Sequence, residues 1–431
     1  MRLSEIRKVY YNNGILTDEQ MTSSRNISIY EGCTARSILT LTSGAFLVGF
    51  AHFLGASNQI AGIVAAIPVF AGIITAFSPI LFERLTNRKL VTCLFCFIGR
   101  LLLGLMIVLP FIKVTPTAKV IMLIVMFLAA NLFLSFTMPA AQTWILGITP
   151  ETIRGSYFGR RESIVLGTVT VLSLVMGQVL DFFDKSGHPL AGFSILFTSV
   201  IVMAVINFIL FSSMREPCNI LSNSKISIKN IFSIPLRNKS YMRIALLMVI
   251  WNVGFQLAVP FTYVYMVSAL HLGYGFITFM SVLASASSVV SVPFWGRLAD
   301  KRSWMFLFKL MMVIQILCFF IWFFINGSTA LILLPITHII GGSAISGINI
   351  SINNIQYNHA PVENKTVYMG FSSAVNGIFG FAGTLAGSYL LKLAEHYNIA
   401  VLGFNVGNMQ LLFLLAALIL LFGIIFLSYS D

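Results

Sequence analysis

The sequence predicts an all-α membrane protein whose twelve transmembrane helices form two pseudo-symmetric six-helix bundles. Three observations predict this fold: the chain is strongly apolar, long apolar runs recur along it, and its two halves repeat each other. Of the 431 residues, 58% are hydrophobic and only 10% are charged, and the mean hydropathy is +0.91. This composition excludes ordinary soluble proteins and disordered chains.

Twelve apolar runs follow one another along the chain. Each has about 20 residues or more, which is enough to cross roughly 30 Å of hydrocarbon as an α-helix. Six runs precede the longest polar break and six follow it. They cover residues 31–54, 59–82, 90–112, 119–148, 163–182, 190–212, 243–267, 273–295, 304–325, 329–357, 367–391 and 408–427.

The two halves share a motif that recurs after 211 residues, each time at the end of an apolar run. The first copy is ITPETIRGSYFG at residues 148–159, and the second is HAPVENKTVYMG at residues 359–370. A proline, a basic residue, a tyrosine and a glycine stand at matching positions. A membrane chain built from two parallel copies of one half is typical of transporters whose two domains rock against each other.

The polar breaks predict the domain organisation. Thr17 and Gln20 have the spacing of a capping box, which favours a short helix before the first apolar run. The expected parts are a cytoplasmic N-terminal extension (1–30), an N-terminal six-helix bundle (31–212), a cytoplasmic central loop (213–242) and a C-terminal six-helix bundle (243–431).

The net charge of +13 indicates orientation and not a nucleic-acid partner. If both termini are cytoplasmic, all but five of the 27 Lys and Arg residues lie on the cytoplasmic side. This asymmetry is the positive-inside rule, so we expect a multi-pass protein of the cell membrane with both termini inside. The five exceptions are Arg100 within a run and Lys113, Lys119, Lys185 and Lys392 outside.

Several classes of function find no support in the sequence. A phosphate-binding loop of the form GxxxxGK[ST] is absent, and a central loop of about thirty residues is too short for a nucleotide-binding domain. Cys93 and Cys96 form a CxxC pair without a second pair to complete a metal site. No catalytic constellation is recognisable. We therefore expect a protein that is not an enzyme and that uses no cofactor, no metal and no ATP.

The segment GRLADKRS at residues 296–303 resembles the loop signature of the major facilitator superfamily, roughly G-x-L-A-D-(R/K)-x-G. The 6+6 layout resembles that superfamily too, and RGSYFGRR at residues 154–161 is similar to a bacterial branch without an assigned substrate. The resemblance implies alternating access, with the first and fourth helices of each half lining a central cavity. The residues expected to gate this movement are Arg84, Arg88, Arg154, Gly296, Arg297, Asp300 and Lys301.

Topology alone explains the basic residues of this loop equally well. Asp300 is the better gating candidate, because an acid is not needed for topology. The glycine-proline pattern of the fifth helix of drug/proton antiporters is missing from the run at 163–182, which weakens the drug-efflux hypothesis without excluding it.

Polar side chains form stripes at helical spacing on the fourth, seventh and tenth runs. Because polar groups are costly in lipid, we expect them to line the substrate cavity, although hydrogen bonding between helices is the alternative. The 211-residue offset places Ser135 on Ser346 and Gln142 on Asn353. The candidates are Asn131, Ser135, Gln142, Asn252, Gln256, Ser346, Asn349 and Asn353.

Arg100 stands out as the one charged residue deep in an apolar run. It follows Lys89 by 11 residues, or about 16 Å of helix, and no run offers an acidic partner at that depth. Arg100 either binds an anionic substrate or is structural within the N-terminal half. The resemblance favours the structural role, because the third helix is usually peripheral in the superfamily.

The coupling of transport is open. His52 and His338 are the candidates for proton coupling, although a lone histidine in a membrane helix is more often a packed residue. Sodium coupling, exchange and uniport stay open. The sequence thus favours a monomeric secondary transporter for a small polar organic solute. A drug, amphipath or lipid exporter is the alternative, and a non-transporting receptor would need a soluble output domain.

Overall fold

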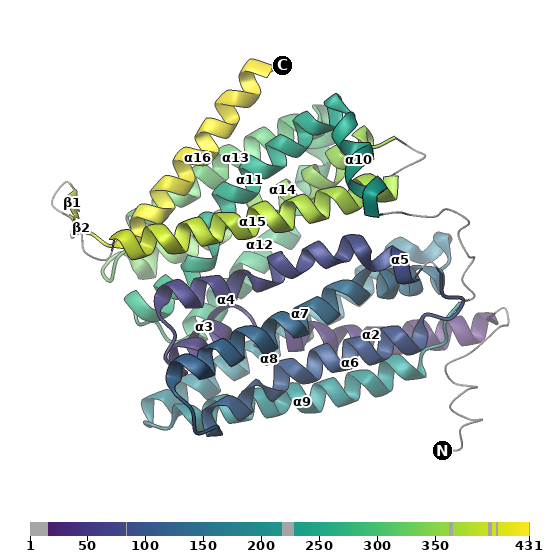
Figure 1. Cartoon of the computed structure of the whole chain (residues 1–431), viewed down its shortest axis with the longest axis horizontal. Coiled ribbons are helices and arrows are strands. Elements are labelled where there is room, and N and C mark those ends of the chain that lie inside the picture. The colour runs from purple at the N-terminus through teal and green to yellow at the C-terminus, as the bar shows by residue number, and fades with distance from the viewer. Residues whose placement is uncertain are drawn as a thin grey trace. The chain divides into compact units, whose positions relative to one another are not determined.

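The computed structural model describes residues 16–82, 84–217, 228–361, 365–394, 399–401 and 404–430 (Figure 1). Contacts group the chain into two compact units. Unit 1 comprises residues 1–55 and 74–228, and unit 2 comprises residues 56–73 and 229–431. The first part of the second apolar run therefore packs with the helices of unit 2.

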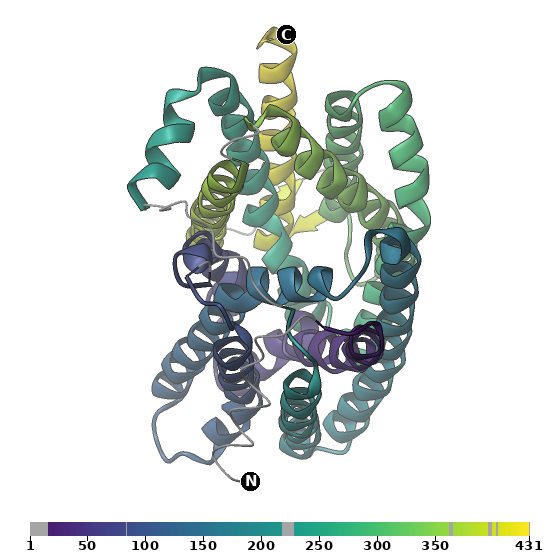
Figure 2. The same cartoon turned by 90° about the vertical axis from the view of Figure 1, so that its right-hand side faces the viewer.

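Unit 1 consists of helices, seen closer to end-on in Figure 2. Thr115 caps α7 through its side chain, and Pro116 follows at the first helical position, where its missing N–H costs nothing. The elements are α2 (Asp18–Leu41), α3 (Gly44–Phe53), α5 (Ser78–Phe82), α6 (Lys89–Leu105), η2 (Met106–Phe111), α7 (Pro116–Gly147), η3 (Glu151–Ile153), α8 (Arg154–Lys185) and α9 (Pro189–Ser213).

Helix α2 begins where the capping box predicts, but it is not short. The side chain of Thr17 accepts from the amide of Gln20 at 3.3 Å, and that of Gln20 accepts from the amide of Thr17 at 3.2 Å. The helix then continues to Leu41 and bends by 44° into α3, with Gly44 at a positive φ of 56°. The predicted start of the first span at residue 31 is therefore too late.

Unit 2 carries the remaining helices and one short hairpin. The hairpin is antiparallel, and Ile399 pairs with Val406. The elements are α4 (Asn58–Ala71), α10 (Ile228–Arg237), α11 (Lys239–Val264), η4 (Tyr265–Ala269), α12 (Tyr274–Lys301), α13 (Trp304–Phe323), α14 (Ala330–His359), α15 (Lys365–Ala394), β1 (Ile399–Val401), β2 (Phe404–Val406) and α16 (Asn408–Ser430), while η1 (Gly72–Phe77) spans the boundary between the units.

The helices confirm the predicted membrane architecture. In the described residues, eleven helices are long and apolar enough to cross a membrane, and the bent pair α2–α3 makes up to twelve. No membrane β-sheet is needed to account for the apolar runs, because each of them falls on a helix.

Glycines on α15 bring its backbone close to two neighbouring helices. A Cβ at Gly383 would lie 2.6 Å from the carbonyl oxygen of Val253 on α11, and one at Gly387 would lie 2.5 Å from that of Leu257. At Gly377 a Cβ would lie 2.6 Å from Ile73 Cγ1 and 3.0 Å from the carbonyl oxygen of Val69 on α4. Since real Cβ atoms do not approach so closely, these positions require glycine for close helix packing.

Candidate functional site

Three of the predicted cavity residues have exposed amide side chains. They are Gln142 on α7 in unit 1, and Asn349 and Asn353 on α14 in unit 2. An exposed amide inside a membrane-spanning helix is costly against hydrocarbon, so such side chains usually meet water or a polar ligand. These faces are therefore suited to a polar path.

Three other predicted residues lie within the packing of their units. Asn131 is buried, and its Nδ2 donates to the carbonyl of Phe127 at 2.8 Å. The buried Ser346 hydroxyl donates to the carbonyl of Ser343 at 2.8 Å. The half-buried Ser135 accepts a hydrogen bond at its backbone carbonyl from Thr75 Oγ1 at 3.2 Å. The side chains of Asn131 and Ser346 therefore offer less to a ligand than the exposed amides do.

A cluster of amides lies between α11 and α15 of unit 2. Asn252 Nδ2 donates to Asn376 Oδ1 at 2.9 Å and to the carbonyl of Met248 at 2.8 Å. The side chain of Gln256 is buried one turn further along α11. A Cβ at Gly380 would lie 3.4 Å from Gln256 Cγ and 3.8 Å from Asn252 Oδ1, so this glycine leaves space beside both amides.

Sequence reasoning missed Asn376. Asn376 lies in a glycine-rich run whose small residues suggest helix packing. Unlike the polar residues of the tenth run, it does not belong to a long polar stripe. A single amide in the middle of an apolar run was the signal available. The structure brings it into contact with Asn252, which the sequence did predict.

Arg100 has an acidic partner, which corrects the prediction that no span provides one. Its Nη1 donates to Asn207 Oδ1, and its Nη2 lies 3.4 Å from Glu31 Oε1. The other carboxylate oxygen of Glu31 lies 3.4 Å from Arg161 Nη2. Because α2 begins at Asp18, Glu31 lies inside the helix and not at its start. Arg100 is thus paired within unit 1 with Glu31 of α2 and hydrogen-bonded to Asn207 of α9.

The first residues of the central loop bind the ends of α6 and α7 in unit 1, a contact that the sequence did not predict. The two carboxylate oxygens of Glu216 accept from the amides of Arg88 and Lys89 at 2.9 Å each, which caps the N-terminus of α6. Burial raises the pKa of the Glu216 carboxyl, and these backbone hydrogen bonds oppose that rise. Trp144 Nε1 donates to the carbonyl of Arg215 at 2.8 Å.

The predicted gating residues divide into two groups. Arg88 donates through Nε to the carbonyl of Phe82 at 2.7 Å, and Arg154 pairs with Glu151 at 3.1 Å. The others are exposed or half-buried, and no ion pair of Asp300 occurs among the residues that the structure describes. The exposed or half-buried ones are Arg84, Gly296, Arg297, Asp300 and Lys301.

The repeated tyrosine ties the fifth helix to the first helix of unit 1. Tyr157 on α8 donates to the carbonyl of Arg25 on α2 at 3.1 Å and contacts the Ser28 hydroxyl. One turn later, Arg161 Nε donates to the carbonyl of Ser28 at 3.2 Å. Two successive turns of α8 are thereby fixed to α2.

The second copy makes corresponding contacts in unit 2. Tyr368 on α15 accepts from Asn238 Nδ2 at 3.2 Å, and its carbonyl accepts from the Tyr241 hydroxyl at 3.1 Å. One turn later, Ser372 shares a hydrogen bond of 2.6 Å with Tyr241. Ser372 follows Arg161 by the same 211 residues that separate the tyrosines. The two copies of the motif therefore share the positions of their contacts as well as their sequence.

The two histidines differ in setting. His338 Nδ1 lies 2.8 Å from the carbonyl of Leu334, and its ring centroid lies 5.9 Å from that of Trp322. His52 is half-buried on α3. Across the described residues, no group of three or more His, Cys, Asp or Glu side chains is placed to hold a metal ion.

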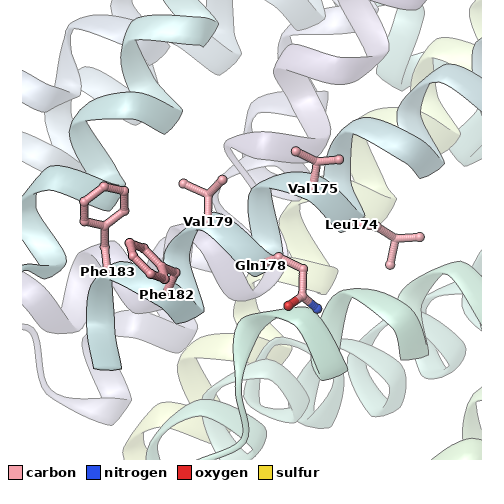
Figure 3. Close-up of a pocket in the computed structure, with 6 residues that line it drawn as sticks. All are labelled: Leu174, Val175, Gln178, Val179, Phe182 and Phe183. Atoms are coloured by element: carbon pink, nitrogen blue, oxygen red, sulfur yellow. The ribbon is translucent and has the colours of Figure 1, made fainter. Parts of the chain in front are cut away.

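Open apolar hollows lie on α8. Figure 3 shows one of about 440 Å³, in which Gln178 is the single polar side chain among apolar neighbours. A second hollow, of about 590 Å³, lies between α8 and α9. The first is lined by Leu174, Val175, Gln178, Val179, Phe182 and Phe183.

Comparison with known proteins decides the family. A family model described as Major Facilitator Superfamily matches residues 33–384. The chain belongs to the major facilitator superfamily. It is therefore a multi-pass membrane protein of a transporter family, as the sequence predicted.

Solved structures share the superfamily fold with this chain. A mutant of the nucleoside transporter NupG has a TM-score of 0.70 at 14% identity, and the match covers 94% of this chain and 98% of the NupG chain. A bacterial homologue of the human lysosomal transporter Spinster has a TM-score of 0.61 at 14% identity, covering 94% and 95%. A bacterial metal transporter has a TM-score of 0.57 at 12% identity, covering 97% and 100%. No curated protein matches the chain.

Proposed function

We propose that this superfamily member is a secondary transporter that moves a small polar organic solute across the cell membrane without ATP hydrolysis. In the proposed mechanism of alternating access, the solute site opens to one side of the membrane at a time. Both termini are cytoplasmic in this proposal, because that orientation places the basic loops inside. The transporter acts as a monomer and carries out no chemical reaction.

The exposed amides of α7 and α14 support a polar solute. Gln142 and Asn353 occupy matching positions in the two halves, and each offers both a donor and an acceptor. Asn252 and Asn376 add a second pair of amides on α11 and α15. Groups of this kind suit hydroxyls, amides and carboxylates, which are the functional groups of common metabolites.

Uptake into proteoliposomes without nucleotide tests this function. Uridine is the first solute to measure, because the NupG structure is described as a nucleoside transporter. We expect Asn353→Ala and Gln142→Ala each to lower uptake about tenfold, which corresponds to roughly 1.4 kcal/mol. Asn354→Ala is the matched control, since its Nδ2 already donates to the carbonyl of Ile350 at 2.8 Å. Unchanged uptake in both test variants, at equal amounts of reconstituted protein, would count against the site.

Proton coupling through His338 or His52 is part of the proposal, with sodium coupling as the other outcome of the same assay. Uptake is compared under an imposed pH gradient and under an imposed sodium gradient. If His338 carries the proton, His338→Gln loses the stimulation by the pH gradient but keeps exchange of solute across the membrane. Stimulation by sodium alone would assign coupling to neutral oxygens instead.

An exporter of amphipaths or lipids is the second candidate function. The observation that favours it is the open apolar hollow on α8, whose volume of about 440 Å³ falls in the range of small-molecule sites. In this case, Gln178→Leu alters transport of an amphipathic dye while leaving uridine uptake unchanged. Equal dye transport by both proteins would remove the support for this candidate.

A further inference from the structure

Arg36 is an exposed charged residue inside the first membrane-spanning pair of helices. It lies on α2, five residues before that helix ends at Leu41 and bends toward α3. Its guanidinium makes no hydrogen bond or ion pair with the residues that the structure describes. The sequence did not mark Arg36 as deep in the membrane, because the first span was expected to begin only at residue 31.

The contacts of α2 show how deep Arg36 lies. Arg25 Nη1 donates to the carbonyl of Ile148 at 2.8 Å, and the hydroxyl of Ser24 accepts from the amide of Arg215 at 2.9 Å. These partners follow the ends of α7 and α9 by one and two residues, so Arg25 is level with the ends of these two spanning helices. Arg36 follows 11 residues later, or about 16 Å of helix, which is near the middle of a 30 Å hydrocarbon core.

Arg36 points away from the charged cluster of unit 1. Glu31 precedes it by five residues, which turn the helix by about 140° at 3.6 residues per turn. Glu31 is buried against Arg100 and Arg161, whereas Arg36 is exposed. Thr40, one turn beyond Arg36 on the same face, is half-buried.

A charged side chain at this depth requires water or a partner. Placing an arginine in the middle of the hydrocarbon is costly on every scale, and snorkelling serves residues near helix ends. Intramembrane charges almost always face a bundle interior or a water-filled cavity. Since Arg36 lies outside the interior of its own unit, a water-filled path is the environment that accounts for it.

Among the residues of unit 1 that the structure describes, no acidic side chain pairs with Arg36. The carboxylate of Glu31 is shared between Arg100 and Arg161, so it does not serve Arg36. Glu162 on α8 is exposed and forms no ion pair with Arg36. A guanidinium in a cleft with low-dielectric walls concentrates anions, and its fork of donors matches a carboxylate or phosphate.

We propose that Arg36 binds the anionic group, a carboxylate or a phosphate, of the transported solute. This inference rests on the proposed transport function and names the class of solute. Arg36 takes the role that the sequence assigned to Arg100 as one of two alternatives.

The first test asks whether position 36 faces water. In a chain whose five cysteines are replaced by alanine, Arg36→Cys is treated in proteoliposomes with a charged methanethiosulfonate reagent. Val202→Cys is the matched control, because Val202 is 52% exposed in the middle of the apolar helix α9. We expect position 36 to react at least ten times faster than position 202. Equally slow reaction at both positions would overturn the proposal.

The second test compares matched pairs of neutral and anionic compounds. Binding of uridine and uridine 5′-monophosphate, and of glucose and gluconate, is followed by thermal shift of the detergent-purified chain. An anionic member should stabilise the wild type more than its neutral counterpart. Arg36→Gln should lose at least tenfold in affinity for that anion, and Arg36→Lys should lose less, because it keeps the charge without the bidentate geometry.

Arg160→Gln is the control for the loss of one positive charge, since Arg160 is exposed near the start of α8. It should bind the anion like the wild type. Unchanged anion affinity in Arg36→Gln would refute the role of Arg36. Uptake of a neutral solute that survives Arg36→Gln would refute the anionic class while leaving the transport function standing, whereas absence of any uptake by the wild type would refute the transport function itself.

Discussion

At the scale of single residues, the buried charges of unit 1 form one connected group. Glu31 lies between Arg100 and Arg161, and the side chain of Asn207 donates to the carbonyl of Glu31 at 3.0 Å. These contacts join α2 to α6, α8 and α9. The group explains how a guanidinium at mid-depth is tolerated without a ligand.

Removing the Glu31 carboxylate should therefore strongly destabilise the protein. Glu31→Gln leaves the buried Arg100 and the half-buried Arg161 without their counter-charge. Breaking a buried pair in this way costs about 3–5 kcal/mol. We expect a large fall in the melting temperature of the detergent-purified protein. Glu162→Gln, which removes an exposed carboxylate from α8, should change it little. If the two variants melt alike, the group does not hold the helices together.

The same contacts show where sequence reasoning stopped at this scale. Arg100 was recognisable because it interrupts a long apolar run. Its partner Glu31 was not, because residues 18–30 are polar and no hydropathy pattern marks them as part of a spanning helix. Packing against α8 and α9 extends α2, and this is tertiary information. The same displaced boundary hid Arg36.

At the scale of helices, close packing depends on glycine at defined positions of α15. The five glycines of this helix were visible in the sequence, but the partner of each was not. Gly383 and Gly387 face α11, while Gly377 faces α4. Period and composition identify a small-residue face, and only the fold determines which helix it meets.

Substitution of these glycines gives a direct test. Gly383→Ala places a Cβ 2.6 Å from the carbonyl oxygen of Val253, so α15 must move. Overpacking of this kind costs about 1–3 kcal/mol. Gly167→Ala is the control, because nothing lies within 4 Å of its Cβ position on α8, and helix propensity favours alanine there by up to about 1 kcal/mol. Melting temperatures of the two variants should shift in opposite directions.

The twin tyrosines make a second prediction for helices. Tyr157→Phe removes the hydrogen bonds of its hydroxyl to α2, and Tyr368→Phe removes the one that its hydroxyl accepts from Asn238, the cap of α11. Each loss should cost about 0.5–1.5 kcal/mol. Tyr389→Phe, at a position 63% exposed, should be neutral. Chemical-denaturation midpoints would show the pattern, and a neutral effect in both test variants would mean that the repeat reflects sequence history and not a shared contact.

At the scale of the whole molecule, the sequence predicted the superfamily fold almost completely. Apolar runs, the loop segment Gly296–Ser303 and the 211-residue repeat each record a property that the bilayer or the internal duplication imposes. Less of the candidate site could be predicted from the sequence. The pair of Asn252 and Asn376 joins helices more than 120 residues apart in sequence, and the docking of Glu216 onto α6 depends on a loop without periodicity.

The proposed transport cycle makes one structural demand that no single conformation satisfies. Alternating access requires at least two arrangements of the transporter, and a solute that binds one of them better must shift their populations. The contacts of the tyrosines lie within each unit, so they would persist throughout the cycle.

Distances between spin labels test this central claim most directly. In the cysteine-free chain, one label is placed at Leu146 near the end of α7 and one at Asn358 near the end of α14, both exposed positions. Pulsed electron resonance then gives their separation in lipid with and without a transported solute. The account predicts two populations of distance whose ratio changes when the solute is added. A single population that the solute leaves unchanged would contradict it.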